Sequence, residues 1–284
     1  MSDSLQRRKA ETFAALHRAD GCFVMPNAWD TGSAKMLAAC GFPAIGTTSA
    51  GIACSLGRPD HSFSAGAARI DRETMIASVR AIAASIDVPL SADLEAGYGE
   101  TPEDVAETMR RAIDAGAVGG NIEDYTGDRA QPLFEVSLAV ERIKAAREAI
   151  NRSGLPFVLV GRTDGCLVDQ PEAVAESIRR ANLYRLAGAD CLFVPGISDA
   201  ETIRRLVGEI DGPLNVVMGL TKSSLTVADL TALGVRRISI GASLARAMYL
   251  RIQRAGQEMM TTGTFTFADE QLPQEEVNRI LLSR

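Results

Sequence analysis

Short apolar runs rich in valine, isoleucine, leucine and phenylalanine recur along the chain, and each is followed by a longer segment with helically spaced apolar positions. The runs have the length and composition of buried strands. They predict eight strands, at Cys22–Asn27, Ala44–Ser49, Leu90–Glu95, Gly119–Asp124, Phe157–Thr163, Cys191–Pro195, Leu214–Met218 and Arg237–Gly241. The periodic segments predict eight helices, at Thr31–Cys40, Asp71–Ile86, Pro102–Ala115, Glu135–Asn151, Pro171–Ala187, Ala200–Glu209, Val227–Leu233 and Ser243–Gly256.

An uninterrupted series of eight strand–helix units predicts an α/β protein with the architecture of a (β/α)8 TIM barrel. The strands are nearly continuous apolar runs, as expected for parallel strands covered by helices. A doubly wound open sheet is the alternative, but its usual GxGxxG turn after the first strand is missing. Helix ends carry their own signals. Thr101 and Pro102 predict a capped helix start, and Gly116, Gly188 and Gly234 predict helix stops.

No stretch rich in proline or serine marks a linker between domains. The sequence therefore predicts one barrel domain over residues 1–260. Residues 261–284 are expected to form a C-terminal extension with a short helix at Pro273–Leu282, which would make a packing or subunit contact.

Composition and charge exclude several classes of protein. The chain has 284 residues, with 30 Lys and Arg against 36 Asp and Glu, and lacks the basic surplus of nucleic-acid-binding proteins. No apolar run approaches the ~20 residues that span a membrane, and residues 1–20 contain no signal-peptide core. The five cysteines are scattered and form no CxxC pair. These features predict a cytoplasmic protein whose partners are neither nucleic acid nor a membrane.

Acidic residues gather at the ends of two neighbouring predicted strands. Asp93 and Glu95 are two positions apart and so face the same side, and Glu123 ends the next strand. Active sites of such barrels lie at the carboxyl ends of the strands. Converging carboxylates repel unless a cation or protons intervene, and oxygen ligands favour Mg²⁺ or Mn²⁺. The alternative is a structural role for Asp93 or Asp124, as a loop cap or as the partner of an arginine.

Other polar residues at strand ends are candidates for binding a carboxylate. Arg162 ends the fifth strand and could clamp a carboxylate with its planar fork, or form a salt bridge to Glu123 or Asp124. Asn215 lies on the seventh strand and could contact substrate. The second strand ends in small residues whose backbone N–H groups can approach an anion, namely Thr48, Ser49, Ala50 and Gly51. The loop after them contains Asp60 and His61.

Five ordered motifs make the chain similar to a known family. They are Asn27-Ala28-Trp29-Asp30, Thr48-Ser49-Ala50-Gly51 with Leu56-Gly57-Arg58-Pro59-Asp60, Asp93-Leu94-Glu95-Ala96-Gly97-Tyr98-Gly99, Ile122-Glu123-Asp124, and Arg162-Thr163-Asp164. With them the chain resembles the isocitrate lyase/phosphoenolpyruvate mutase superfamily, over roughly Cys22 to Gln253. The resemblance implies a (β/α)8 barrel that swaps its eighth helix with a neighbour, within a homodimer or homotetramer. It also implies a Mg²⁺ cofactor and a 2-oxo or 2-hydroxy carboxylate substrate.

The same resemblance assigns roles to individual residues. Asp93 would bind the metal directly, with Glu95 and Glu123 assisting, partly through water. Glu95 departs from the aspartate that is common there, and Asp60 matches a loop aspartate near the metal. Arg162 matches the arginine that steadies a developing enolate or a second carboxylate. The segment that holds the substrate carboxylate would be Thr48, Ser49 and Ala50.

The chain departs from the family after the fourth strand. Family lyases carry a Lys-Lys/Arg-Cys-Gly-His stretch there, whose cysteine is the acid that completes cleavage. This chain has Tyr125 to Leu133 in that place, without cysteine, histidine or lysine. Residues 129–133 are similar to part of the gating loop of the mutases, but the Lys-Thr-Asn that precedes it there is absent.

We therefore expect a Mg²⁺-dependent carbon–carbon lyase, similar to methylisocitrate lyase, or a decarboxylase. It would act on a small 2-oxo or 2-hydroxy dicarboxylate through an enolate. Tyr98, Tyr125 and Asp60 are candidates for its general base or proton donor. The alternatives are a phosphonopyruvate or phosphoenolpyruvate-type mutase or hydrolase, a Schiff-base aldolase using Lys222, and a non-catalytic barrel that binds a carboxylate.

Overall fold

A computed structural model describes residues 3–60, 70–168 and 170–282. Within this part of the chain, nine short parallel strands form one sheet in the order β1-β9-β8-β7-β6-β5-β4-β3-β2. The strands are β1 (Phe23–Val24), β2 (Asn27–Ala28), β3 (Ile45–Thr47), β4 (Leu90–Asp93), β5 (Gly119–Glu123), β6 (Val158–Arg162), β7 (Cys191–Phe193), β8 (Leu214–Val217) and β9 (Arg237–Ser239).

The sheet closes on itself through the first predicted strand. That segment consists of β1, which pairs with β9, and β2, which pairs with β3. Only two residues separate them, and both bond to neighbouring strands. Met25 N donates to Ile238 O at 2.8 Å, and Pro26 O accepts from Gly46 N at 2.8 Å. The segment is interrupted where proline lacks an N–H donor. The two edges of the sheet are therefore one stretch of chain, and the predicted (β/α)8 barrel is confirmed.

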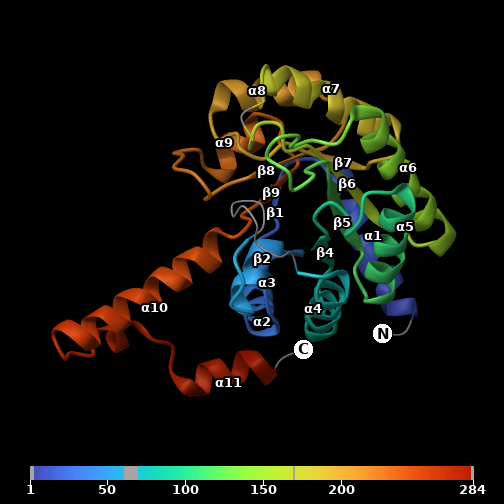
Figure 1. The fold of residues 1–284 in the computed structure, drawn as a ribbon. Coiled ribbons are helices and arrows are strands. Elements are labelled where there is room, and N and C mark those ends of the chain that lie inside the picture. The colour runs from blue at the N-terminus through green and yellow to red at the C-terminus, as the bar shows by residue number, and fades with distance from the viewer. Residues whose placement is uncertain (1–2, 61–69, 169, 283–284) are drawn as a thin grey trace.

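Helices alternate with the strands and surround the sheet (Figure 1). The predicted capping signal at Thr101 is confirmed, because its side chain and that of Asp104 each accept from the other's backbone N–H. The helices that follow the strands are α2 (Thr31–Ala39), α3 (Ser49–Ser55), α4 (Arg72–Ser85), α5 (Pro102–Asp114), α6 (Val136–Ser153), α7 (Ala173–Leu186), α8 (Ala200–Glu209), α9 (Val227–Ala232) and α10 (Ser243–Thr261).

Two helices were not predicted. α3 begins at Ser49, because Thr48 accepts a hydrogen bond from Gly51 N and caps it. α1 (Asp3–Arg18) precedes the barrel and closes its amino-terminal end. Phe13 of α1 lies so close to Gly119, the first residue of β5, that a Cβ there would come within 2.4 Å of its ring.

Two apolar clusters make the core. The larger cluster lies between the sheet and the surrounding helices. The smaller fills the inside of the barrel with side chains from the strands and from α1. Polar side chains interrupt the inner cluster towards the carboxyl ends of the strands, and this interruption forms the candidate site.

The last predicted helix is present but does not lie against its own barrel. α10 extends away from it, and the chain returns through a 3-10 turn at Thr266–Glu270 to α11 (Gln274–Leu282), beside α2 (Figure 1). Lys35 of α2 donates to Leu281 O at 2.5 Å. Ala245 is the buried residue of α10, whereas Met248 and Ile252 are exposed. Among the described helices, none combines the length and apolar character needed to cross a membrane.

Candidate active site

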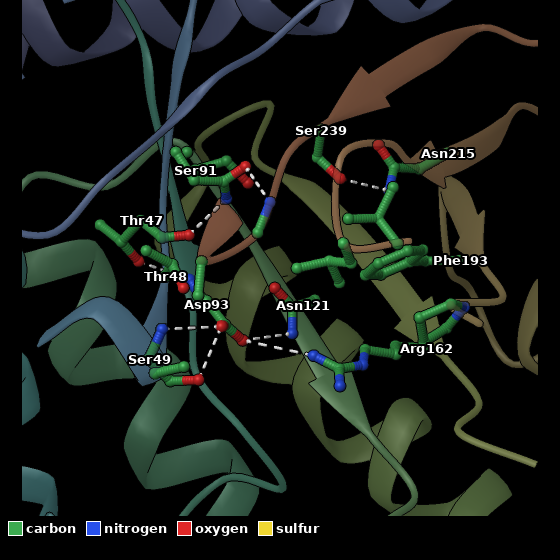
Figure 2. A pocket seen from close by; sticks show the side chains of 18 of the residues that line it. Thr47, Thr48, Ser49, Ser91, Asp93, Asn121, Arg162, Phe193, Asn215 and Ser239 are labelled. Atoms are coloured by element: carbon green, nitrogen blue, oxygen red, sulfur yellow. Dashed lines mark hydrogen bonds and ion pairs between the residues drawn. The ribbon is translucent and has the colours of Figure 1, made fainter. Parts of the chain in front are cut away.

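A cavity of about 110 Å³ opens at the carboxyl ends of the strands. Figure 2 shows its polar side chains converging from strands all around the barrel. The lining includes several residues that the sequence singled out, namely Thr48, Ser49, Ala50, Asp60, Asp93, Arg162 and Asn215. It also includes polar residues that were not predicted to belong to the site, namely Asn27, Thr47, Ser91, Asn121, Arg237 and Ser239. Each of these lies in or beside an otherwise apolar strand, and that was the signal available for finding them.

Asp93, the last residue of β4, is held from both sides (Figure 2). Its Oδ2 accepts from Ser49 N at 2.9 Å and from Ser49 Oγ at 2.8 Å, and its Oδ1 accepts from Asn121 Nδ2 at 2.9 Å. Burial disfavours the charged form. The Arg162 guanidinium and these hydrogen bonds outweigh it and hold the pKa of Asp93 below its usual value. Asp93 is therefore an oriented carboxylate at the cavity wall.

Arg162, the last residue of β6, lies within a group of acids. Its Nε and Nη2 donate to the two oxygens of Asp164 at 2.6 and 2.8 Å. Its Nη1 lies 2.9 Å from Glu123 Oε2 and 3.8 Å from Asp93 Oδ1. Burial would lower the pKa of Arg162, but the surrounding carboxylates raise it well above its usual value. The salt bridge to Glu123, which the sequence analysis offered as an alternative to substrate binding, is present, and Arg162 lines the cavity as well.

Glu123 is buried behind Arg162, and its Oε1 has no hydrogen-bond partner among the described residues. Burial raises the pKa of Glu123 well above its usual value; Arg162 opposes the rise, and nearby carboxylates add to it. Glu95 is also buried and has a positive φ of 49°, in the left-handed region that non-glycine residues rarely occupy. The acids around Arg162 outnumber its single positive charge, so this environment favours either a further cation or a proton on Glu123.

The acids fit a divalent ion of the kind the sequence predicted. The described residues hold no preassembled group of three or more His, Cys, Asp or Glu side chains around one point. Mg²⁺ does not need such a group, because it is commonly bound by one or two carboxylates with water and substrate completing its shell. Asp93 and Asp60 present carboxylates to the cavity, and the unpartnered Oε1 of Glu123 lies in the same acidic environment.

A second buried hydrogen-bond network, centred on Asp124, supports the residue that holds Arg162. Asp124 Oδ1 accepts from Asp164 N at 2.9 Å, and its Oδ2 accepts from Tyr184 Oη at 2.6 Å and from Arg180 Nη1 at 3.1 Å. Asp164 in turn binds Arg162 with both oxygens. The alternative that Asp124 pairs with an arginine is thus confirmed, and Asp124 fixes the residue that orients Arg162.

Replacing Tyr184 with phenylalanine is expected to lower the free energy of unfolding by about 1–3 kcal/mol, since a charged, buried acceptor loses a hydrogen bond. Tyr184 is 1% exposed, so water cannot replace its hydroxyl. Urea unfolding of both proteins measures the difference. An unchanged unfolding midpoint would show that the hydroxyl contributes nothing to this network.

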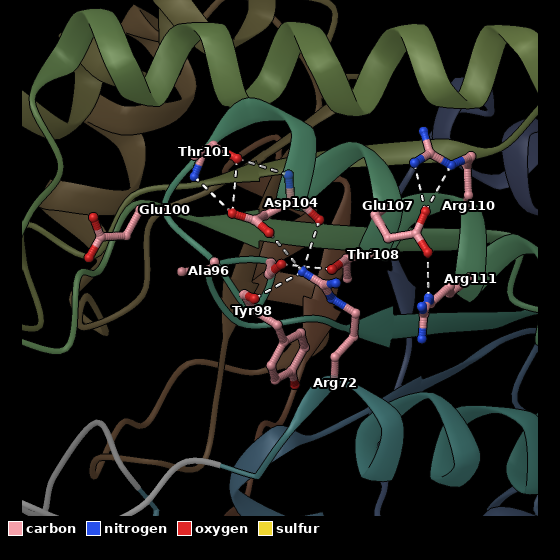
Figure 3. Close-up of polar contacts among 12 residues, drawn as sticks. Arg72, Ala96, Tyr98, Glu100, Thr101, Asp104, Glu107, Thr108, Arg110 and Arg111 are labelled. Carbon is pink, nitrogen blue, oxygen red and sulfur yellow. Dashed lines mark hydrogen bonds and ion pairs between the residues drawn. The ribbon is translucent and has the colours of Figure 1, made fainter.

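Two candidate acid–base residues lie outside the described lining of the cavity. Tyr98 belongs to the loop between β4 and α5, whose backbone carbonyls accept hydrogen bonds from Arg72 and Thr108 (Figure 3). Arg72 donates to Tyr98 O at 2.9 Å, and Arg142 donates to Gly99 O at 2.9 Å. Tyr125 is buried and pairs with Leu133 in an antiparallel bridge.

Gly51 was predicted to bind substrate, but the described lining does not include it. It packs against its neighbours instead. A Cβ at this position would lie 2.6 Å from Thr48 Cγ2 and 2.9 Å from Trp29 Cβ. Glycine is therefore required here for packing. His61 lies outside the described residues.

Comparison with known proteins identifies the family. The model of the phosphoenolpyruvate phosphomutase family matches residues 13–260. The chain belongs to this family. It is 44% identical to a Burkholderia cenocepacia protein provisionally described as a lyase/mutase, with a TM-score of 0.93 and coverage of 99% of this chain and 98% of that one. It is 37% identical, over 81% of each chain, to an uncharacterized protein of Mycobacterium tuberculosis.

A third comparison connects the family to a reaction class. The structure of 2,3-dimethylmalate lyase, a member of the PEP mutase/isocitrate lyase superfamily, is 28% identical. Its TM-score is 0.82, with coverage of 96% of this chain and 94% of that chain. The superfamily resemblance is thus confirmed. The phosphoenolpyruvate phosphomutase family contains carbon–carbon lyases and mutases.

Proposed function

We propose that the protein is a Mg²⁺-dependent carbon–carbon lyase that acts on a small 2-oxo or 2-hydroxy dicarboxylate through an enolate. One observation carries the proposal: an oriented carboxylate, Asp93, and a fixed guanidinium, Arg162, face the same cavity at the carboxyl ends of the strands. The similarity to 2,3-dimethylmalate lyase supports the reaction class.

Different residues of the site would bind the metal and stabilise the oxyanion. Asp93, with Glu95 and Glu123, would hold Mg²⁺, which would polarise the substrate oxygen next to the carboxylate. Arg162 offers a permanent positive charge to the oxyanion that develops as the C–C bond breaks. Because Asp164 and Glu123 already fix the guanidinium, little reorganisation is needed during the reaction.

The first turn of α3 would bind the substrate carboxylate. Ser49 donates both its amide and its hydroxyl to Asp93, so its donors are occupied and the amide of Ala50 is the one offered to the substrate. Ala50 lies one residue further into the turn, where backbone N–H groups lack intrahelical acceptors. Asp60 is the one of the three proposed acid–base candidates that the described lining of the cavity includes, so we assign it that role.

The test is release of pyruvate or glyoxylate from oxaloacetate, isocitrate, methylisocitrate, dimethylmalate and phosphonopyruvate, with Mg²⁺ and with EDTA. We expect metal-dependent cleavage of at least one dicarboxylate. Turnover of phosphonopyruvate alone would favour a mutase or hydrolase. A folded protein that binds these acids and converts none of them would favour a carboxylate-binding barrel.

We also propose that the protein is a homo-oligomer in which α10 packs against a second copy. α10 extends from the barrel and carries exposed apolar side chains; Met248 and Ile252 are four positions apart and so share one face, of a kind that marks interfaces. The double substitution Met248→Glu with Ile252→Glu is expected to convert the oligomer to monomer, as measured by light scattering after size exclusion. Leu186→Glu, at an 82% exposed leucine on α7, is the matched control. A monomeric wild-type protein would refute the proposal.

A further inference from the structure

Arg237 is a buried cation without a carboxylate partner in the described part of the chain. It is 3% exposed, begins β9 and lines the cavity. Its Nε donates to Asn215 Oδ1 at 2.8 Å, and its Nη1 lies 3.3 Å from His17 Nε2. The side-chain amide of Asn215 carries no charge, so the protonation state of His17 decides whether the charge of the Arg237 guanidinium is balanced.

His17 is neutral. Its Nδ1 lies 2.9 Å from Phe13 O, and because a carbonyl can only accept, Nδ1 carries the proton. Nε2 is then left with a lone pair, which accepts from Arg237. Burial and the Arg237 charge together lower the pKa of His17 to about 3, so the ring stays uncharged at neutral pH. Arg237 therefore keeps an unbalanced positive charge.

The other buried arginines are satisfied differently. Arg180 pairs with Asp124 and Glu176, and Arg142 donates to backbone carbonyls of the β4–α5 loop. A guanidinium has five N–H donors, and the described residues provide acceptors for two of those of Arg237. Burying a charge is costly unless it is paired. An uncompensated guanidinium on a cavity wall therefore has the chemistry of an anion subsite.

Arg237 and Arg162 line the same cavity at different depths. Arg162 is the last residue of β6, at the mouth, whereas Arg237 is the first residue of β9, deeper inside. Apolar Phe193 and Val217 are among the residues that line the cavity with them. With the proposed Mg²⁺ and Arg162 at the mouth, an uncompensated Arg237 at the inner end and apolar walls between them, the cavity suits a short molecule that is anionic at both ends.

Asn215 orients the deeper guanidinium. Its Oδ1 accepts from Arg237, and its Nδ2 donates to Ser239 Oγ at 3.0 Å (Figure 2). The side-chain amide of Asn215 is thus held at both ends, which fixes the orientation of the Arg237 guanidinium. Asn215 was predicted to contact substrate, and this geometry gives it a positioning role as well.

We propose that Arg237 forms a second carboxylate subsite at the inner end of the cavity and selects substrates that carry a carboxylate at both ends. This inference rests on the proposed function, because the first carboxylate is taken to lie at the strand ends. Arg237 would contact the second carboxylate, while Asn215 and His17 position the guanidinium.

The test compares acids that differ only in the second carboxylate. 2-Oxoglutarate is paired with 2-oxovalerate, and oxaloacetate with 2-oxobutyrate, and the dissociation constant of each is measured by calorimetry in the presence of Mg²⁺. In the wild-type protein at least one diacid should bind about tenfold or more tightly than its matched monoacid. In Arg237→Gln that ratio should fall to about one, with monoacid affinity nearly unchanged.

The chain offers a matched control in the adjacent arginine. Arg236 is half-buried, donates to Gly21 O at 2.6 Å and is not part of the described cavity lining, so Arg236→Gln should keep the wild-type ratio. Equal binding of both members of each pair to the wild-type protein overturns the subsite, and so does a ratio that survives Arg237→Gln. If Arg237→Gln does not fold, a crystal structure of the wild-type protein with the tighter diacid decides. A second carboxylate bonded to Arg237 supports the subsite, and one bonded elsewhere refutes it.

The two proposals fail in different ways. Diacid preference that depends on Arg237, without cleavage of any acid, would leave the subsite in place and remove the lyase assignment. Metal-dependent cleavage, together with a diacid preference that is unchanged in Arg237→Gln, would support the lyase assignment and refute the subsite.

Discussion

Asp93→Asn is expected to lower kcat/KM by about a thousandfold or more, equivalent to about 4 kcal/mol of transition-state stabilisation. The amide removes the negative charge that would hold the metal. It also cannot accept on both sides, because donors from Ser49 and Asn121 face the two oxygens of the present carboxylate. The measurement is steady-state turnover of the substrate found in the panel, across a Mg²⁺ titration.

Asp114→Asn is the matched control for Asp93→Asn, since Asp114 is an exposed aspartate at the end of α5. It should leave both turnover and Mg²⁺ dependence unchanged. Circular dichroism and urea unfolding would verify that Asp93→Asn still folds. Full activity of folded Asp93→Asn at unchanged Mg²⁺ dependence would falsify the metal assignment.

Arg162→Lys is expected to lower kcat at least about a hundredfold even though the positive charge is kept, because removing one donor to a developing oxyanion costs about 10²–10³ in rate. Lysine lacks the planar fork that bonds both oxygens of Asp164 while reaching Glu123. The ammonium group would therefore sit at a different point relative to the oxyanion. Comparing kcat and KM separately shows whether the loss lies in the chemical step.

Arg179→Lys provides the comparison for Arg162→Lys. Arg179 makes the same two-point contact with a carboxylate, that of Glu176, but on the outer surface of α7. Its substitution should not change kcat. If Arg162→Lys retained most of the wild-type kcat, the guanidinium would be a structural ion-pair partner and another group would stabilise the enolate.

Much of the fold was determined by the sequence alone. Hydrophobic periodicity is local, because a strand or helix must turn its apolar positions towards the core whatever its neighbours are. The eight strand–helix units were therefore visible, and the cap at Thr101 needed only residues three positions apart. The carboxyl ends of parallel strands meet at one end of a barrel, so the sequence alone was enough to place Asp93 and Arg162 close together.

The tertiary structure alone decided which of these polar groups are already paired. Asp164 follows Arg162 by two residues, but only the fold shows that it accepts from Nε and Nη2 of Arg162 and is itself held by Asp124. Likewise, Tyr125 has the chemistry of a proton donor, yet the chain folds it beside Leu133 and outside the described lining of the cavity.

Long-range contacts were the other part that only the fold could decide. His17 and Arg237 are 220 positions apart and meet because α1 closes the amino-terminal end of the barrel. No local pattern encodes such a pairing, since it depends on how separate elements pack and not on the periodicity of either one. The sequence therefore determined the barrel and the residues at its mouth, whereas packing decided the uncompensated charge deeper in the cavity and the direction in which α10 leaves the barrel.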